Sequence, residues 1–151
     1  MQAKIKWISG ATFEGVSGSG HCVVMDGPPE HGGNNNGIRP MEMLLLGLGG
    51  CAAFYVMHVL QKSRQPAEDC EVEIEAIRQD KAPGLITDIH VHFILTGNNL
   101  KQEHVQRAVQ LSSEKYCSAS LMLSAKANIT HDFEIKYSPE TQWGQTPLKR
   151  Q

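Results

Sequence analysis

The feature that most constrains this chain is a long apolar segment, MEMLLLGLGGCAAFYVMHVL, which runs from Met41 to Leu60 with Cys51 near its midpoint. Pro40 precedes the segment and Lys62 follows it. Proline is tolerated in the first turn of a helix, and a basic side chain suits the negative end of the helix dipole. The pattern predicts one buried helix over this segment.

Three glycines interrupt the segment, at Gly47, Gly49 and Gly50. Each costs about 1 kcal/mol relative to alanine inside a helix. Glycine permits the close approach of another backbone, so we expect a shallow groove here, with the thiol of Cys51 at its floor. A cysteine in such a place is either an inert core residue or a guarded nucleophile, and free cysteines are often simply buried.

The segment is not expected to cross a membrane. Its uncharged run, from Met43 to Met57, is shorter than the roughly 18 to 20 residues that a membrane span requires. The first ten residues, MQAKIKWISG, hold no apolar core of the length found in secretory signals. We therefore expect a cytoplasmic protein.

The composition narrows the classes of partner. The chain has 151 residues, 40% of them hydrophobic, which is enough for one core. The formal net charge is -2, so the chain lacks the basic surface with which proteins bind nucleic acid or anionic membranes. A small molecule or another protein is the expected partner. The four cysteines, at positions 22, 51, 70 and 117, have no spacing typical of zinc sites, and we expect them to be reduced unless they are reactive.

The rest of the chain divides into strands, helices and a loop. Alternation of apolar and polar residues predicts strands at 4–8, 12–16, 21–25, 71–78, 86–95 and 127–137. Helical spacing predicts a second long helix over 101–115 and a short helix after residue 117. The polar segment 30–37, rich in glycine and asparagine, is expected to be a mobile loop. We expect a single domain over 1–137, followed by a polar tail over 138–151.

His90 and His92 fall on one face of the strand predicted at 86–95. An H-x-H pair is half of a metal site. However, both histidines belong to the polar set of the strand, and the sequence places no third ligand beside them. We interpret them as exposed strand residues and expect no metal.

Cys51 and Cys117 are both flanked by small residues, which let two helices approach closely. A disulfide between them requires Cα atoms roughly 4.4 to 6.8 Å apart. If the sulfurs meet, one thiolate can attack an O–O bond and become a sulfenic acid, which the other thiol captures as a disulfide. From local sequence, Cys117 has the better reason for a lowered pKa, because it begins a helix and Lys115 is near.

The segments around the two cysteines resemble the OsmC/Ohr family of osmotically inducible and organic-hydroperoxide-resistance proteins. The first segment is RPMEMLLLGLGGC at 39–51, and the second is EKYCSASL at 114–121. The order of strands and helices agrees with the family from residue 1 to about residue 137. Within the family, the chain is most similar to an uncharacterised bacterial branch.

This resemblance implies an α+β fold, with antiparallel sheets wrapped around long central helices in an intertwined homodimer. It implies that Cys51 is the peroxidatic cysteine and that Cys117 resolves it, which reverses the assignment from local sequence. Organic hydroperoxides are the expected substrates, because the site is apolar. The expected pocket residues are Leu45, Phe54, Tyr55 and Leu121. No bound cofactor is expected, and an external dithiol reductant, such as a lipoyl-carrying protein, would restore the thiols.

The chain departs from the peroxidases of the family in two places. Those enzymes pair the thiolate with an arginine from the N-terminal hairpin and with a carboxylate directly after the helix-starting proline. Here residues 4–20 contain no arginine, and Met41 follows Pro40. Arg39 and Glu42 are the candidate substitutes, since losing a charge-assisted hydrogen bond costs a few kcal/mol. The alternative function is therefore a dimeric stress protein of the same family that is weak in redox chemistry and binds a small molecule.

Overall fold

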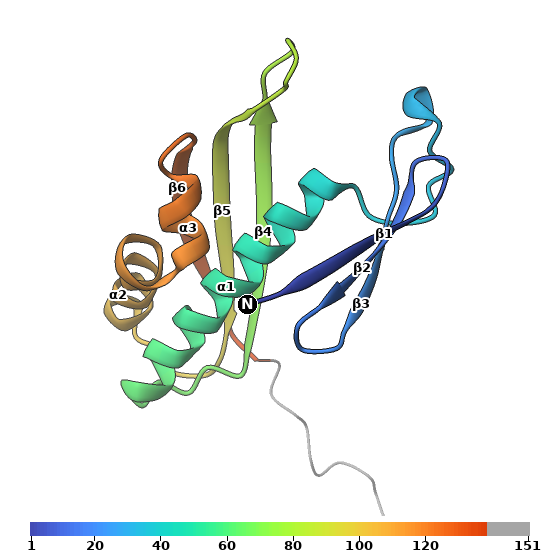
Figure 1. The fold of residues 1–151 in the computed structure, drawn as a ribbon. Coiled ribbons are helices and arrows are strands. Elements are labelled where there is room, and N and C mark those ends of the chain that lie inside the picture. Colours follow the sequence, from blue (N-terminus) through green and yellow to red (C-terminus); the bar gives the residue numbers. More distant parts are fainter. Residues whose placement is uncertain (139–151) are drawn as a thin grey trace, which may run out of the picture. The chain divides into compact units, whose positions relative to one another are not determined.

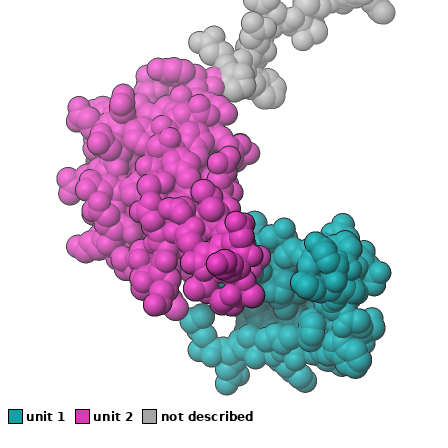
Figure 2. Space-filling view, turned by 90° about the horizontal axis from the view of Figure 1, so that it is seen from above, with its two compact units in different colours: residues 1–50 teal, residues 51–151 magenta. Residues whose placement is uncertain are grey.

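The structure is a computed structural model in which residues 1–138 are described. It consists of two compact units, Met1–Gly50 and the part of the chain from Cys51 onward, which Figure 2 colours separately. Apart from Ser138, the tail predicted over 138–151 lies outside the described residues.

The first unit is built on a three-stranded antiparallel sheet in the order β1-β2-β3 (Figure 1). Its elements are β1 (Ala3–Ser9), β2 (Thr12–Ser17), β3 (Cys22–Met25), the short 3₁₀ helix η1 (Pro29–His31) and the beginning of helix α1. Gly10 adopts a positive φ of 51° in the turn between β1 and β2, a conformation that glycine reaches without steric penalty. The three strands predicted from the alternating pattern are confirmed.

A buried carboxylate holds the segment that joins β3 to α1. Asp26 accepts hydrogen bonds from the backbone N–H groups of Gly27, Asn34 and Asn36, at 2.9, 2.8 and 2.9 Å. The N–H of Asn36 contributes most to a lowered pKa of this carboxyl group. Segment 30–37, which the composition predicted to be a mobile loop, is thus fixed by hydrogen bonds at its centre. Because the donors are backbone N–H groups, the residue types in the segment did not indicate that Asp26 would hold it.

Helix α1 spans Pro40–Lys62, which confirms the helix predicted over residues 41–60. By length and composition it is apolar enough to cross a membrane, although the uncharged run within it was expected to be too short. The core helix of a soluble protein meets the same test, so this property of α1 is weak evidence for a membrane.

Gly47 and Gly50 of α1 do not make the close approach that was expected of them. A β-carbon added at Gly47 or at Gly50 would meet no atom within 4 Å. Within the part of the chain that the structure describes, no backbone therefore occupies the groove predicted beside Cys51.

The second unit contains a three-stranded sheet in the order β4-β5-β6. Its strands are β4 (Asp69–Arg78), β5 (Ile86–Thr96) and β6 (Asn128–Lys136). Strands β4 and β5 pair antiparallel, whereas β5 and β6 pair parallel. The expectation of purely antiparallel sheets was therefore wrong for this sheet. The alternating pattern that revealed each strand does not distinguish the two directions of pairing.

A helical crossover makes the parallel pairing possible, because parallel neighbours cannot be joined by a tight turn. It consists of α2 (Gln102–Leu111), the π-helical segment η2 (Ser112–Tyr116) and α3 (Ser118–Leu123). The single helix predicted over 101–115 is thus divided between α2 and η2.

One face of this sheet carries the core of the second unit. Fully buried side chains are contributed by α1, β5 and α2, and they include Val56, Leu60, Ile89, Phe93, Leu95, Val105 and Ala108. On the other face of β5, His90 and His92 alternate with these core residues and are partly exposed. The chain is therefore a mixed α+β protein with two sheets, as expected.

Candidate functional site

The two cysteines singled out by the sequence come together within the second unit. Cys51 lies in α1 and is partly buried, whereas Cys117 is fully buried between η2 and α3 and caps the N-terminus of α3. Each thiol shifts the pKa of the other, because the two sulfurs are close neighbours. The expectation that small neighbours allow these two segments to meet is confirmed.

Two contacts hold Cys117 close to α1. The hydroxyl of Ser112 donates a buried hydrogen bond of 3.0 Å to the carbonyl oxygen of Ala52, the residue after Cys51. The ring of Tyr116 stacks on the ring of Tyr55, with centroids 5.9 Å apart. Segment η2 is therefore fastened to α1 at both of its ends, directly before Cys117.

The surroundings of Cys51 favour its thiolate. Desolvation raises the pKa of this thiol, but hydrogen bonds from the N–H of Ala119, from the thiol of Cys117 and from Ser118 outweigh it, so that the pKa is lowered. Both the hydroxyl and the N–H of Ser118 contribute. The first turn of α3 thus presents donors to a sulfur that belongs to a different helix.

Cys117 has the opposite character. Burial, and next the hydrogen bond to Cys51, raise the pKa of this thiol to about 11, although the N–H of Ser120 donates to its sulfur at 3.4 Å. Local sequence favoured Cys117 as the thiolate, and that prediction was wrong. Position at a helix N-terminus is visible in the sequence, whereas complete burial is not.

The predicted pocket residues of the second unit carry apolar surface. Phe54 is 64% exposed and packs edge-on against Tyr55, with centroids 5.3 Å apart. Leu121 of α3 is also exposed. Tyr55 and Tyr116 line a hollow of about 220 Å³ together with His58. Apolar surface is thus available beside the cysteines, while the role of these side chains in substrate binding stays a prediction.

Arg39, Glu42 and Leu45 belong to the first unit. The guanidinium of Arg39 donates to the carbonyl oxygens of Asp26, at 3.2 Å, and of Gly27. The carboxylate of Glu42 accepts from the backbone N–H of Arg39 at 3.0 Å, which is the capping contact typical of the third residue of a helix. Both side chains have local structural partners, and their proposed action on the thiolate stays a prediction.

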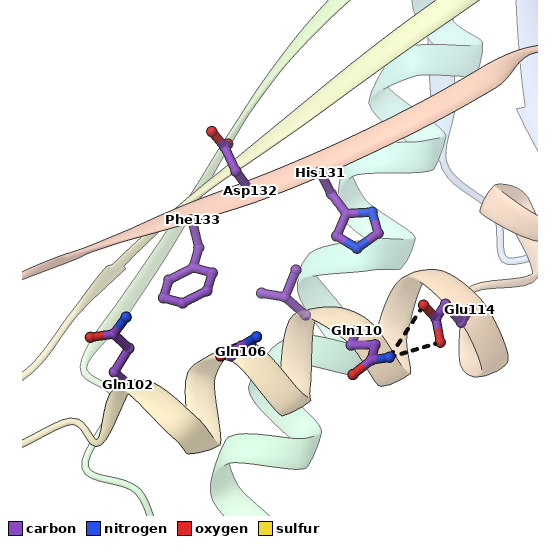
Figure 3. A pocket seen from close by; sticks show the side chains of 8 residues that line it. Gln102, Gln106, Gln110, Glu114, His131, Asp132 and Phe133 are labelled. Atoms are coloured by element: carbon purple, nitrogen blue, oxygen red, sulfur yellow. Dashed lines mark hydrogen bonds between the residues drawn. The ribbon is translucent and has the colours of Figure 1, made fainter.

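Sequence reasoning missed a polar groove of about 550 Å³ between α2 and β6, shown in Figure 3. Gln102, Gln106 and Gln110 line it at helical spacing, and His131 faces them from β6. Gln110 donates to the carboxylate of Glu114 at 3.2 and 3.3 Å. The sequence did contain a signal for this groove. Glutamines repeat every four residues in α2, which places them in one polar stripe along the helix.

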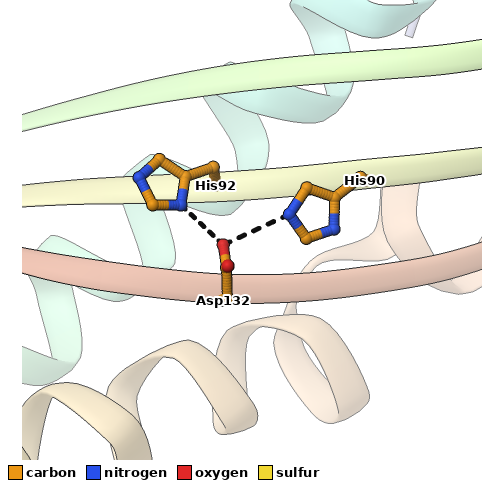
Figure 4. Close-up of side chains that lie close together, drawn as sticks. All are labelled: His90, His92 and Asp132. Atoms are coloured by element: carbon orange, nitrogen blue, oxygen red, sulfur yellow. Dashed lines mark hydrogen bonds and ion pairs between the residues drawn. The ribbon is translucent and has the colours of Figure 1, made fainter.

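The structure also supplies the third group that the histidine pair lacked. Asp132 of β6 lies beside His90 and His92 in Figure 4. One oxygen of its carboxylate is 2.6 Å from Nδ1 of His92 and 3.3 Å from Nε2 of His90. Asp132 was missed because only the parallel pairing of β5 with β6 brings it there.

Comparison with known proteins agrees with this fold. The model of the family described as OsmC-like protein matches residues 32–132. Protein YhfA of Escherichia coli strain K12 is 50% identical over 138 residues, covering 89% of this chain and 98% of YhfA. This agreement confirms the bacterial branch that the sequence indicated.

Solved structures extend the comparison. A hypothetical protein from Aquifex aeolicus VF5 is 28% identical with a TM-score of 0.81, over 91% of this chain and 97% of that one. An organic hydroperoxide resistance protein OsmC from Legionella pneumophila is 17% identical with a TM-score of 0.69, over 88% and 95% of the two chains, and shares the fold. With two thirds of its length matched by the family model and 50% identity to YhfA over 138 residues, the chain belongs to the OsmC-like protein family.

Proposed function

We propose that this protein is a thiol peroxidase that reduces organic hydroperoxides through Cys51 and Cys117. The observation that carries the proposal is the asymmetry of the thiol pair. The pKa of the partly exposed Cys51 is lowered, whereas burial and the bond to Cys51 raise the pKa of Cys117 to about 11. Cys51 is then the more acidic thiol and the proposed nucleophile, while Cys117 holds its proton more tightly and is the proposed resolving thiol.

The reaction divides into two steps on this pair. The Cys51 thiolate attacks one oxygen of the hydroperoxide, an S–O bond forms as the O–O bond breaks, and the alkoxide leaves as an alcohol after taking up a proton. The thiol of Cys117 then attacks the Cys51 sulfenic acid, and a disulfide and one water molecule are formed. The peroxide is reduced by two electrons and the two cysteines are oxidised by two electrons. A dithiol reductant, for which a lipoyl-type protein is the proposed source, restores both thiols and becomes a disulfide itself.

The surface around the pair supports an apolar substrate and a second subunit. Phe54, Leu121 and Met122 are exposed, with Met122 at 77%. Exposed apolar side chains beside a reactive sulfur favour organic hydroperoxides over hydrogen peroxide. The same exposed side chains support assembly of the chain as a homodimer. We propose a cytoplasmic location for the protein. A solved structure of this fold is named as an organic hydroperoxide resistance protein, which agrees with the proposed substrate class.

The test is to expose the reduced protein, without oxygen, to one equivalent of cumene hydroperoxide, block the free thiols and map the cysteines by mass spectrometry. We expect a disulfide between Cys51 and Cys117 within seconds to minutes. Cys22→Ser serves as the matched control, because Cys22 is an exposed cysteine of the first unit. This variant should form the disulfide at the rate of the unmodified protein.

The single variants separate the two roles. Cys51→Ser should consume no peroxide, while Cys117→Ser should consume one equivalent and accumulate a sulfenic acid on Cys51 that dimedone traps. Four free thiols after prolonged exposure of the unmodified protein, or unchanged turnover in Cys51→Ser, would contradict the proposal.

The second candidate is a small-molecule-binding protein of the same fold. It is favoured by the absence of arginine from residues 4–20 and by the engagement of the Arg39 guanidinium with the carbonyl of Asp26. Native mass spectrometry of protein purified from cells would then reveal a retained apolar ligand. Rapid peroxide turnover by protein that carries no ligand would exclude this candidate.

A further inference from the structure

The outer face of the β4-β5-β6 sheet gathers two imidazoles and a carboxylate at its centre (Figure 4). The parallel register places His92 opposite Asp132 and His90 opposite Thr130. One potential ligand atom from each of His90, His92 and Asp132 lies within 4.8 Å of the other two. We propose that these three side chains form a binding site for a divalent transition-metal ion, with Zn²⁺ as the representative ion. The proposal does not depend on the reaction of the cysteines.

The distances suit a metal after small rotations of the side chains. Ligands about 2.1 Å from a tetrahedral Zn²⁺ lie about 3.4 Å from one another. Oδ1 of Asp132 is 3.3 Å from Nε2 of His90 and 2.6 Å from Nδ1 of His92. The shorter contact is a hydrogen bond, and an ion that replaces the shared proton would separate the two atoms. Water would fill the remaining coordination position, as in zinc sites with three protein ligands.

A hydrogen bond outside the trio prepares His90 for this role. Nδ1 of His90 is 2.8 Å from the hydroxyl oxygen of Thr130. When Nδ1 donates its proton to that oxygen, Nε2 carries the lone pair and is directed towards Asp132. Partners that fix the tautomer of a histidine in this way are typical of metal sites. Thr130 thus has a function in the proposed site that an ordinary exposed strand residue would not have.

The charge of the face favours a cation. In the register with β4, Glu73 lies opposite His92 and Glu75 lies opposite His90. Glu134 extends from the same side of β6 as Asp132. These carboxylates from β4 and β6 place negative charge around the two imidazoles, which attracts a cation.

The test is calorimetric titration of the full-length reduced protein with Zn²⁺ at pH 7.5. We expect one ion per chain. His92→Asn and Asp132→Asn should each weaken binding by at least about tenfold, since they remove ligands. Asp88→Asn is the matched control, because it removes the same charge from the same face outside the trio. It should change the affinity by less than about threefold.

The cysteine pair is the competing zinc ligand, and the double variant Cys51→Ser/Cys117→Ser distinguishes it. The proposed site predicts that this variant keeps its affinity for Zn²⁺. Loss of binding in the double variant, with full binding in His92→Asn, would place the ion on the thiols and overturn the proposal. If Asp88→Asn weakened Zn²⁺ binding as much as Asp132→Asn, the ion would be held only by general electrostatic attraction, which would contradict the proposed site. The absence of Zn²⁺ binding at millimolar concentration would also overturn the proposal. Circular dichroism of each variant establishes that it is folded.

Discussion

At Cys51 two opposing effects set the character of the thiol. Partial burial raises its pKa, and donors from α3 together with the thiol of Cys117 lower it by a larger amount. Cys117 sits at the same helix N-terminus, yet it is fully buried and keeps its proton, which it shares with Cys51 in a hydrogen bond. Burial and the direction of one S–H···S hydrogen bond therefore divide the two roles.

The contribution of Ser118 to this balance is testable. In Ser118→Ala, the thiolate of Cys51 loses the hydroxyl donor, so its pKa should rise and its alkylation profile should move to higher pH. At pH 7 the rate of alkylation of Cys51 by iodoacetamide should fall roughly 2- to 10-fold, because one net hydrogen bond contributes about 0.5 to 1.5 kcal/mol. Mass spectrometry resolves the rate at this cysteine. Ser124→Ala is the control, because the hydroxyl of Ser124 donates to the carbonyl oxygen of Leu121 at the other end of α3. If alkylation of Cys51 slowed as much in Ser124→Ala, the hydroxyl of Ser118 would not be the cause.

Some properties of the site residues could be predicted from the sequence, and others depend on the fold. The meeting of Cys51 and Cys117 could be predicted, because both cysteines have small neighbours that let their helices approach closely. Their relative acidity could not, because it depends on the burial of Cys117. Asp132 escaped notice for a similar reason: its proximity to His92 follows from the strand register and not from spacing.

At the scale of elements, η2 is the part of the second unit that positions Cys117. Its five residues form a π-helical turn between α2 and α3, and the N–H of Cys117 donates to the carbonyl oxygen of Ser112 at 2.8 Å. The Ser112 side chain is fully buried, and its hydroxyl bonds the carbonyl of Ala52 in α1. Such π-helical turns are rare and are frequent at functional sites. The extra residue in this turn, together with its bond to α1, directs Cys117 towards Cys51.

Ser112→Ala should therefore weaken both the fold and the thiol pair. We expect the free energy of unfolding to fall by about 1 to 1.5 kcal/mol, the net contribution of a hydrogen bond in the interior, and disulfide formation after peroxide to slow. Urea denaturation and the quenched thiol assay measure the two effects. Ser113→Ala is the matched control, because the Ser113 hydroxyl bonds the carbonyl of Val109 within its own helical segment. If Ser113→Ala were as damaging as Ser112→Ala, the bond to α1 would not be the cause.

Elements were predictable where a repeating pattern defined them. Alternation revealed β4 and β5, and a long apolar run with marked ends revealed α1. The division of 101–115 into α2 and η2 was not predictable, because residues 112–116 continue a helical composition while their hydrogen bonds change. The fixing of segment 30–37 was likewise hidden, since it depends on backbone donors that surround Asp26.

At the scale of the whole molecule, the chain leaves large apolar side chains uncovered. In the second unit, Phe54, Leu121 and Met122 are all exposed. Isolated exposed apolar residues are ordinary, but several of them lie on the helices that carry Cys51 and Cys117, and this is the surface that the proposed homodimer would cover. The open β-carbon positions at Gly47 and Gly50 agree with this interpretation, because a groove unused within the described chain remains available to a partner.

Phe54→Asp should accordingly shift the proposed homodimer towards single chains. Burial of a phenylalanine side chain contributes about 1.5 to 3 kcal/mol, and a carboxylate in its place must lose hydration in an apolar contact. The dissociation constant of the dimer should therefore rise by at least about tenfold. Light scattering after size-exclusion chromatography, over a range of concentrations, distinguishes the 16.6 kDa chain from its dimer. Gln106→Glu, which adds one charge to the exposed side of α2, should leave the mass unchanged. A Phe54→Asp protein that keeps the mass and the concentration dependence of the unmodified chain would show that Phe54 lies outside the subunit contact, and its exposed ring would then be assigned to the substrate alone.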